Sequence, residues 1–125
     1  VAMATYNGEN YIKDQINTIL DCLEENDELV IADDGSTDYT LGIINSFNDD
    51  RIVLIEGHQK GIKQNFANAI KNTSGEYIFL SDQDDIWEKD KVTEVIKCFE
   101  KENCTLVVHD AEVVDENLNM VMSSY

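Results

Sequence analysis

The sequence predicts an α/β fold with a doubly wound, mostly parallel sheet and helices on both faces, and three observations lead to this prediction. Short apolar runs of strand length alternate with longer segments whose apolar residues recur at helical spacing. The runs are apolar throughout, which is typical of parallel strands buried on both faces. Polar residues and glycine follow them, as expected where a strand turns into a helix. This alternation of strands and helices favours one sheet that is covered by helices on both faces.

The amino-terminal part of the chain contains three strand-and-helix pairs. The expected strands are residues 1–5, 29–32 and 52–55. A helix should follow each strand, and the inward positions of the three helices are Ile12, Ile16, Ile19, Leu20 and Leu23, then Leu41, Ile44 and Phe47, then Ile62, Phe66, Ala69 and Ile70. Asn7 or Asn10 is expected to cap the first helix. Residues 73–75 are expected to end the third one.

The remainder of the chain is less regular. Residues 77–80 should form a fourth strand, and a fourth helix should place Val92, Val95, Ile96 and Phe99 on one face. We expect a fifth strand at residues 105–108 and a short one at 113–114, whereas residues 117–125 carry no clear pattern. The chain is expected to be one domain over residues 1–125, taken from a longer protein.

Composition argues against several classes of partner. Twenty-six acidic residues against nine basic ones give a formal net charge of -17, which repels nucleic acid and anionic membrane surfaces. No stretch is long and apolar enough to cross a bilayer, and no signal-peptide pattern is present. Three cysteines without a Cys-x-x-Cys pair favour a reducing, cytoplasmic setting. If the protein attaches to the inner face of the membrane, we expect parts outside this sequence to make that contact.

Three loops are expected to meet at one edge of the predicted sheet. Ligands of doubly wound sheets bind outside the carboxyl ends of the strands, and this rule gathers residues 5–7, 33–36 and 82–85. The first loop offers a hydroxyl, an aromatic ring and an amide for stacking and bonding a base, unless it is only a tight turn. In the second loop Asp33 and Asp34 point to opposite faces, so one can accept from a ligand while the other caps the next helix.

The third loop, Asp82-Gln83-Asp84-Asp85, favours a cation. Asp82 and Asp84 share a face of an extended segment, where two carboxylates repel by roughly 4 kcal/mol at an effective dielectric of about 20. No Lys or Arg lies within four residues upstream, and Lys89 is the nearest downstream. We therefore expect Mg²⁺ or Mn²⁺, which would also neutralise a nucleoside diphosphate. The alternative is a solvated acidic turn that caps the next helix.

Other devices for phosphate or metal binding are missing. No Gly-x-Gly-x-x-Gly follows the first strand, and residues 57–63 only loosely match a P-loop. Ile86 and Trp87 occupy positions that an EF-hand loop needs for a ligand and a glycine. No Ser, Cys or His constellation indicates nucleophilic catalysis.

The three loops, in this order and spacing, resemble the amino-terminal half of the family 2 inverting glycosyltransferases, which have the GT-A fold with its Rossmann-like nucleotide-binding half. Residues 3–8 look like the first-strand signature of that family, and residues 30–38 are close to its most recognisable motif. Residues 82–87 match its Asp-x-Asp-Asp segment in the form common among rhamnosyltransferase-like members. The stretches 61–70 and 75–78 are similar to those that join these motifs.

The resemblance implies roles for individual residues. Thr5 and Tyr6 would line the base pocket and Asp34 would bond the base, with Asp33 nearby. Asp82 would approach the ribose, Asp84 would hold the metal on the diphosphate, and Lys63 would reach the phosphates. The complete set of nucleotide-binding candidates is Thr5, Tyr6, Asn7, Asp33, Asp34, Lys63, Asp82 and Gln83, and the metal candidates are Asp84 and Asp82.

The resemblance also implies an activity. It predicts metal-dependent transfer of a sugar from a UDP- or dTDP-sugar to a saccharide or lipid-linked acceptor, in the synthesis of cell-surface polysaccharide. The general base of the family is an acidic residue well beyond the Asp-x-Asp, so we expect it beyond residue 125. Asp110, Glu112 and Asp115 come too early and are interpreted as solvated loop carboxylates. Ala4 and Lys89 stand where the family often has proline, which affects loop rigidity.

Three other functions share part of this pattern. A nucleotidyltransferase shares the sheet and the cation, but residues 6–10 lack the Gly-rich, Arg-containing loop of that class. A receiver-like signalling domain needs an acidic pair after the first strand, where this chain has Asn7. The third alternative, a domain that binds sugar nucleotides without catalysis, is compatible with the sequence.

Overall fold

The computed structural model describes residues 1–115 and 117–124 of the chain. These residues form two compact units, residues 1–92 and 93–125. The single domain expected over residues 1–125 stays a prediction.

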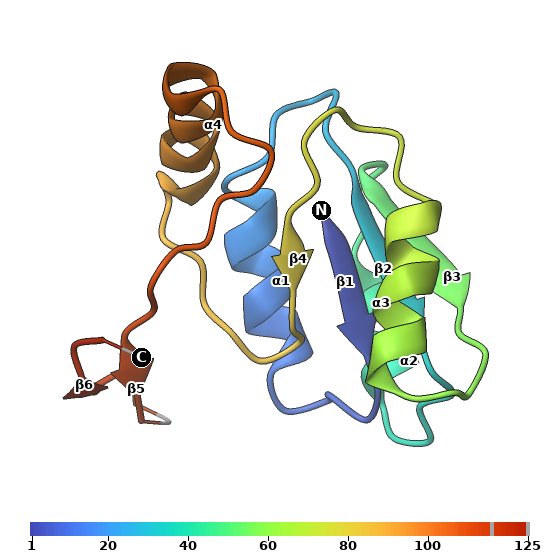
Figure 1. Ribbon diagram of the computed structural model, residues 1–125. Helices are drawn as coiled ribbons and strands as arrows, with labels where there is room; N and C mark the ends of the chain where they lie inside the picture. The colour runs from blue at the N-terminus through green and yellow to red at the C-terminus, as the bar shows by residue number, and fades with distance from the viewer. Residues whose placement is uncertain (116, 125) are drawn as a thin grey trace. The chain divides into compact units, whose positions relative to one another are not determined.

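A four-stranded parallel sheet is the centre of the first unit, with the strand order β3-β2-β1-β4 (Figure 1). The strands are β1 (Ala2–Thr5), β2 (Leu29–Asp33), β3 (Ile52–Glu56) and β4 (Leu80–Ser81). The last residues of β1, β2 and β3 lie level, because Thr5 pairs with Asp33 and Asp33 with Glu56. The predicted doubly wound architecture is therefore confirmed, and strand order reverses between β1 and β4.

Helices cover both faces of this sheet. The helices are α1 (Ile12–Leu20), α2 (Thr40–Ser46) and α3 (Ile62–Lys71), and α3 lies in front of the strands while α1 and α2 lie behind them (Figure 1). Alternation along β1 divides its side chains, so that Met3 packs in the cluster of α1 and Ala2 in that of Ala69 on α3. Small alanines on the α3 side let this helix approach the sheet closely.

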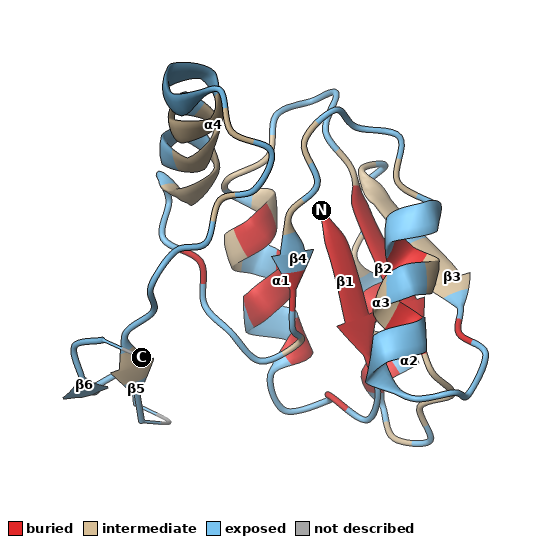
Figure 2. Ribbon diagram, viewed as in Figure 1, coloured by how far each residue is buried: buried red, intermediate tan, exposed pale blue. Residues whose placement is uncertain are grey.

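The hydrophobic core follows the same division. The buried residues concentrate on β1, β2 and the inner side of α1 (Figure 2). The larger cluster contains the inward isoleucines predicted for the first helix, Ile12, Ile16 and Ile19, each completely buried. Burial of one such side chain contributes about 1.5–3 kcal/mol, so this face supplies most of the apolar stabilisation of the unit.

The fourth strand is shorter than predicted. Only Leu80 and Ser81 pair with β1, and the amide of Ala2 donates one further bond to the carbonyl of Phe79 at 2.8 Å. The predicted bounds of 77–80 are therefore wrong, although a strand is present. β4 has one neighbour instead of two, and Leu80 remains 56% exposed, so an apolar run here does not imply burial on both faces.

Two expectations about helix ends have different outcomes. The predicted capping of α1 by Asn7 or Asn10 is wrong, because Tyr11 is the N-cap residue and no side chain caps the helix. The helix α3 ends at Lys71 with Asn72 as its C-cap, just before the predicted stop at residues 73–75.

The second unit contains most of α4 (Lys91–Glu102) and an antiparallel hairpin of β5 (Val113–Val114) and β6 (Met120–Met122). The short strand at 113–114 is confirmed, and β6 arises where no pattern was seen. The strand predicted at 105–108 is absent, since Leu106 and Val108 are 74% and 84% exposed and gain no strand partner among the described residues.

Asp110, Glu112 and Asp115 lie in exposed loops, as expected. Asp115 accepts hydrogen bonds from Asn117 and Asn119, and Asp110 accepts one from Ser124. No helix within the described ranges combines the length and apolarity that a membrane span requires.

Candidate functional site

The first unit has a pocket of about 850 Å³ at the carboxyl ends of its strands, beside the position where strand order reverses. Its size is within the range of small-molecule sites. Loops after β1, β2 and β4 contribute to its wall, together with the beginning of α3. Six of the predicted site residues line it: Thr5, Tyr6, Asp34, Asp82, Gln83 and Asp84.

Asp34 presents an unsatisfied acceptor in this wall. Its Oδ2 accepts a hydrogen bond from the amide of Gly61 at 2.8 Å. Its Oδ1 is buried and has no hydrogen-bond donor among residues 1–115 and 117–124. Leaving a buried oxygen unbonded costs about 1–3 kcal/mol. A ligand N–H or O–H that reached this oxygen would recover that free energy.

Asp33 has a different role from its neighbour. Its carboxylate is buried and accepts from the amides of Gly35 and Ser36 at 3.1 and 2.9 Å, and from the Ser36 hydroxyl. Asp33 is absent from the pocket lining. Of the two alternatives that alternation left open, Asp33 is the residue that forms the turn and Asp34 the one that faces the pocket.

The loop after β1 is bonded to both other loops. The amide of Asn7 donates to the hydroxyl of Ser36, and Asn7 Oδ1 accepts from the amide of Thr37, each at 2.8 Å. Asn7 does not line the pocket, and its predicted ligand contact stays a prediction. Tyr6 lines the pocket and is 55% exposed, so the residue is accessible to a stacking partner.

The acidic loop places Asp82 in an unfavourable electrostatic environment. Burial raises the pKa of Asp82, and the nearby carboxylates of Asp85 and Asp84 raise it further. Lys91 is engaged elsewhere, because its Nζ lies 4.2 Å from the centre of the Trp87 ring. Burial lowers the pKa of Lys91, against the attraction of Asp85.

This loop fits a hard divalent cation in chemistry, though not as a complete protein cage. Asp82 and Asp84 offer carboxylate oxygens, the ligands that Mg²⁺ and Mn²⁺ prefer. No group of three or more His, Cys, Asp or Glu in the described part of the chain is arranged to hold a metal ion. Mg²⁺ sites commonly use one or two carboxylates and complete their coordination with phosphate oxygens and water.

Lys63 lies in the first turn of α3 with its side chain exposed, and it is not part of the pocket wall. Its predicted reach to phosphates stays a prediction. The start of α3 contributes Gly61, Ile62 and Asn65 to the wall instead, and the loop before it contributes Gln59.

Asn65 is the most informative residue that the sequence analysis missed. Its side-chain amide donates to the carbonyls of Thr5 and Ala32, at 3.3 and 2.6 Å, and so ties the ends of β1 and β2 to α3. A Cβ on Gly57 would lie 2.7 Å from Asn65 Oδ1, 2.7 Å from the carbonyl oxygen of Asp33 and 2.8 Å from Cα of Asp34, which explains the glycine there. The sequence did contain an indication of this role, because Asn65 is a polar residue among the apolar positions Ile62, Phe66 and Ala69 of the inward face of the third helix.

Comparison with known proteins identifies similar sequences. The model of Glycosyl transferase family 2 matches residues 1–122. The dTDP-rhamnosyl transferase RfbG of Shigella flexneri is 40% identical over 112 residues, which are 82% of this chain and 39% of that protein. The UDP-Glc:alpha-D-GlcNAc-diphosphoundecaprenol beta-1,3-glucosyltransferase WfgD of Escherichia coli is 32% identical, over 94% of this chain and 47% of its own length. The chain thus spans less than half the length of these relatives.

Solved structures agree with the fold. S. aureus TarS 1–349 in complex with UDP-GlcNAc superimposes with a TM-score of 0.74 and 22% identity, covering 90% of this chain and 39% of that one. The mannosyltransferase PcManGT from Pyrobaculum calidifontis, in complex with GDP-Man and Mn²⁺, gives 0.71 and 23% identity over 78% of this chain and 30% of its own. At these identities the likeness concerns the fold alone.

Proposed function

This chain belongs to glycosyl transferase family 2, and from that premise we propose that its pocket binds a nucleoside-diphosphate sugar, with a divalent cation, as the donor for transfer of the sugar to an acceptor. One observation carries the proposal: Asp34 and Asp84, which are distant in sequence, line the same pocket at the carboxyl edge of the sheet. A single small ligand can therefore touch the base-binding candidate and the metal-binding candidate together.

The two sides of the pocket suit different parts of such a donor. Thr5 and Tyr6 lie beside Asp34, where a base could stack on the ring and donate its imide N–H to the carboxylate. Asp82, which lines the same pocket, would accept from a ribose hydroxyl. Asp84 and Asp82 would hold Mn²⁺ or Mg²⁺ on the diphosphate. When bound, the cation supplies Lewis-acid stabilisation of the charge on the leaving nucleoside diphosphate.

A UDP- or dTDP-sugar is the donor that we propose. Uracil and thymine carry an imide N–H, which an aspartate can accept, whereas the corresponding ring nitrogen of cytosine is an acceptor. The names of the relatives RfbG and WfgD specify a dTDP-linked and a UDP-linked donor. The acceptor would be a saccharide or a lipid-linked saccharide in cell-surface polysaccharide synthesis at the cytoplasmic side of the membrane.

The base that activates the acceptor is proposed to lie outside this sequence. The described carboxylates that follow the acidic loop, such as Asp110 and Asp115, bond to neighbours in their own unit. We therefore propose that this chain is the donor-binding part of a longer enzyme. Nucleotide binding is then the property of this chain that tests the proposal.

Isothermal titration calorimetry tests the proposal directly. The chain is titrated with UDP and with dTDP, in the presence of Mn²⁺ and in EDTA, for the wild type and for Asp84→Ala. We expect Mn²⁺ to tighten binding and Asp84→Ala to abolish that gain. Asp50→Ala removes an exposed carboxylate outside the pocket and serves as the matched control.

Two results would contradict the proposal. Failure of the wild type to bind either nucleotide under both conditions would overturn nucleotide recognition. Binding that is the same in EDTA and in Asp84→Ala would overturn the metal role and leave recognition of the base standing.

A further inference from the structure

The side chain of Gln83 connects the acidic loop with the loop after β1. Its Oε1 accepts from the hydroxyl of Thr5 at 2.7 Å and from the amide of Tyr6 at 2.9 Å, and its Nε2 donates to the carbonyl of Tyr6 at 3.2 Å. These three bonds join residues that are 77 or 78 positions apart. We call this set of bonds the Gln83 clamp.

The clamp leaves Gln83 little capacity for a ligand. An amide oxygen has two lone pairs, and both Oε1 lone pairs have a donor within the chain. The hydroxyl proton of Thr5 is also used, because it is donated to Gln83. Gln83 therefore lines the pocket with its acceptor oxygen already bonded, and its predicted contact with the nucleotide stays a prediction.

Gly8 provides the space that the clamp needs. A Cβ at this position would have three atoms of the Gln83 amide as its nearest neighbours, with Oε1 at 2.5 Å, Cδ at 2.7 Å and Nε2 at 3.3 Å. The backbone of Gly8 is not in the left-handed region, so alanine would be acceptable there in conformation. The requirement for glycine comes from the side chain of Gln83.

Gln83 lies between Asp82 and Asp84 in the chain, and all three residues line the pocket. Carboxylates that repel each other separate unless the backbone is held. The clamp fixes the residue between them to the end of β1, which is part of the central sheet. It therefore opposes the relaxation of the loop in the absence of a cation.

We propose that Gln83 is a positioning residue that holds Asp82 and Asp84 in place for the cation, and that Gly8 is glycine because the Gln83 amide occupies the space of a side chain. This inference rests on the proposed function. It assigns Gln83 a role in metal affinity through the loop, with no direct contact to nucleotide or metal.

The test measures the gain in UDP affinity that Mn²⁺ gives over EDTA, by calorimetry, for five proteins. These are the wild type, Gln83→Ala, Gly8→Ala, the double variant, and the control Gln64→Ala, whose exposed amide lies on α3 outside the pocket wall. Mutation of residues that orient metal ligands typically costs 10–100-fold in metal affinity. We expect the Mn²⁺ gain to fall by roughly 10-fold or more in Gln83→Ala and in Gly8→Ala, and to be unchanged in Gln64→Ala.

The double variant separates positioning from general damage to the fold. Removal of the Gln83 side chain empties the space beside Gly8, so we expect Gly8→Ala to add nothing to Gln83→Ala. A variant that is merely less stable changes its melting temperature but keeps the ratio of affinities with and without Mn²⁺. Gly8→Ala deletes no hydrogen-bonding group, so it tests the proposal even where Gln83→Ala folds poorly.

The outcomes distinguish this inference from the function on which it rests. A wild type that does not bind UDP overturns both. A wild type that shows the Mn²⁺ gain, with the full gain kept in Gln83→Ala and Gly8→Ala, overturns the positioning role alone. Equal losses from Gly8→Ala in both backgrounds also overturn it, because the effect would then not pass through Gln83.

Discussion

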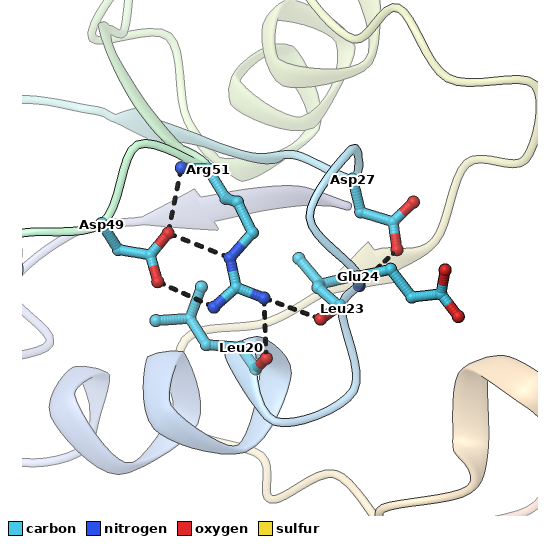
Figure 3. A network of polar contacts seen from close by, with 6 residues as sticks. All are labelled: Leu20, Leu23, Glu24, Asp27, Asp49 and Arg51. Carbon is cyan, nitrogen blue, oxygen red and sulfur yellow. Dashed lines mark hydrogen bonds and ion pairs between the residues drawn. The ribbon is translucent and has the colours of Figure 1, made fainter.

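The two ends of the parallel sheet differ in whether their charged side chains have partners within the chain. At the amino end, Arg51 precedes β3 and closes the end of α1 (Figure 3). Its Nη1 donates to the carbonyls of Leu20 and Leu23, at 3.1 and 2.7 Å, and its Nε and Nη2 donate to the carboxylate of Asp49. These hydrogen bonds lower the pKa of Asp49 from 3.8 to about 2. The guanidinium has a partner on each side.

At the carboxyl end, Asp34 and Asp82 form no ion pair with any of the described residues. Asp34 keeps a buried oxygen without a donor among the described residues, and burial with neighbouring carboxylates raises the pKa of Asp82. The sheet itself is the same at both ends, so the difference lies in the loops. Charges paired within the chain stabilise the fold, whereas the unpaired ones at the pocket are available to a ligand that brings the missing donor and cation.

The largest expected effect is on stability, at the amino end. Arg51→Met keeps much of the aliphatic stem but removes the guanidinium bonds to Asp49, Leu20 and Leu23. Because hydrogen bonds of charged groups contribute about 1.5–3 kcal/mol each and this side chain is partly exposed, we expect a loss of about 3 kcal/mol. Urea unfolding measures it, with Lys13→Met as an exposed control. A loss below about 1 kcal/mol would show that the pairing is not stabilising.

The next effect concerns affinity, at the carboxyl end. Asp34→Asn keeps the shape of the side chain but replaces one carboxylate oxygen by an N–H donor. We expect UDP affinity to fall by about 2 kcal/mol, or roughly 30-fold, because the imide of uracil would lose its acceptor. Stability should hardly change. The competing ligand is CDP, whose ring nitrogen is an acceptor, so the variant should narrow the preference for UDP over CDP. An unchanged preference would remove Asp34 from base recognition.

A smaller effect is expected at Asn7, which joins the loops after β1 and β2 without lining the pocket. Asn7 has φ of 50°, a left-handed conformation that asparagine tolerates better than alanine. Asn7→Ala loses this advantage and the acceptor for the Thr37 amide, and should cost about 1 kcal/mol in unfolding free energy. Asn7→Asp retains the acceptor and should lose less. Greater damage from the aspartate would indicate that charge, not geometry, governs this turn.

The sequence predicted those parts of the fold that depend on short-range pattern. The runs at β1 and β2 are apolar because these central strands are buried on both faces, and the spacing of Ile12, Ile16 and Ile19 is that of a helix. The run at β3 also forms a strand, but at an edge of the sheet, where Val53 stays 40% exposed. The same reasoning gave an incorrect strand at 105–108. Residues 105–108 have strand propensity, but a strand also needs a neighbour, and pairing is a property of the tertiary structure.

For the candidate site, the sequence predicted the location but not the bonds between individual residues. The sheet rule brought the loops of Asp34 and Asp84 to one edge, and both line the pocket. Alternation separated Asp33 from Asp34 but could not decide which one faces inward. The bonds of Gln83 and Asn65 to Thr5 could not be predicted, because they join side chains and backbone across 60 or more positions of the chain.

The smallest effect is the pH dependence of stability, and its sign should differ between the two ends. Asp49 has a depressed pKa, so its stabilisation is present above its usual value of 3.8 and is lost as the pH falls through about 2. Asp82 has a raised pKa, so its charged form is unfavourable in the folded chain, and stability improves as the pH falls through that raised value toward 3.8.

Urea unfolding measures these effects between pH 7 and the pH of about 2 at which Asp49 becomes protonated. At neutral pH, Asp49→Asn should be less stable than the wild type and Asp82→Asn more stable. Both differences should shrink as the carboxylates become protonated, and Mn²⁺ with UDP should reverse the advantage of Asp82→Asn, because the ligand then supplies the charge that the loop lacks. A stabilising Asp49→Asn, or a destabilising Asp82→Asn without ligand, would contradict the assignment of paired charge to one end and unpaired charge to the other.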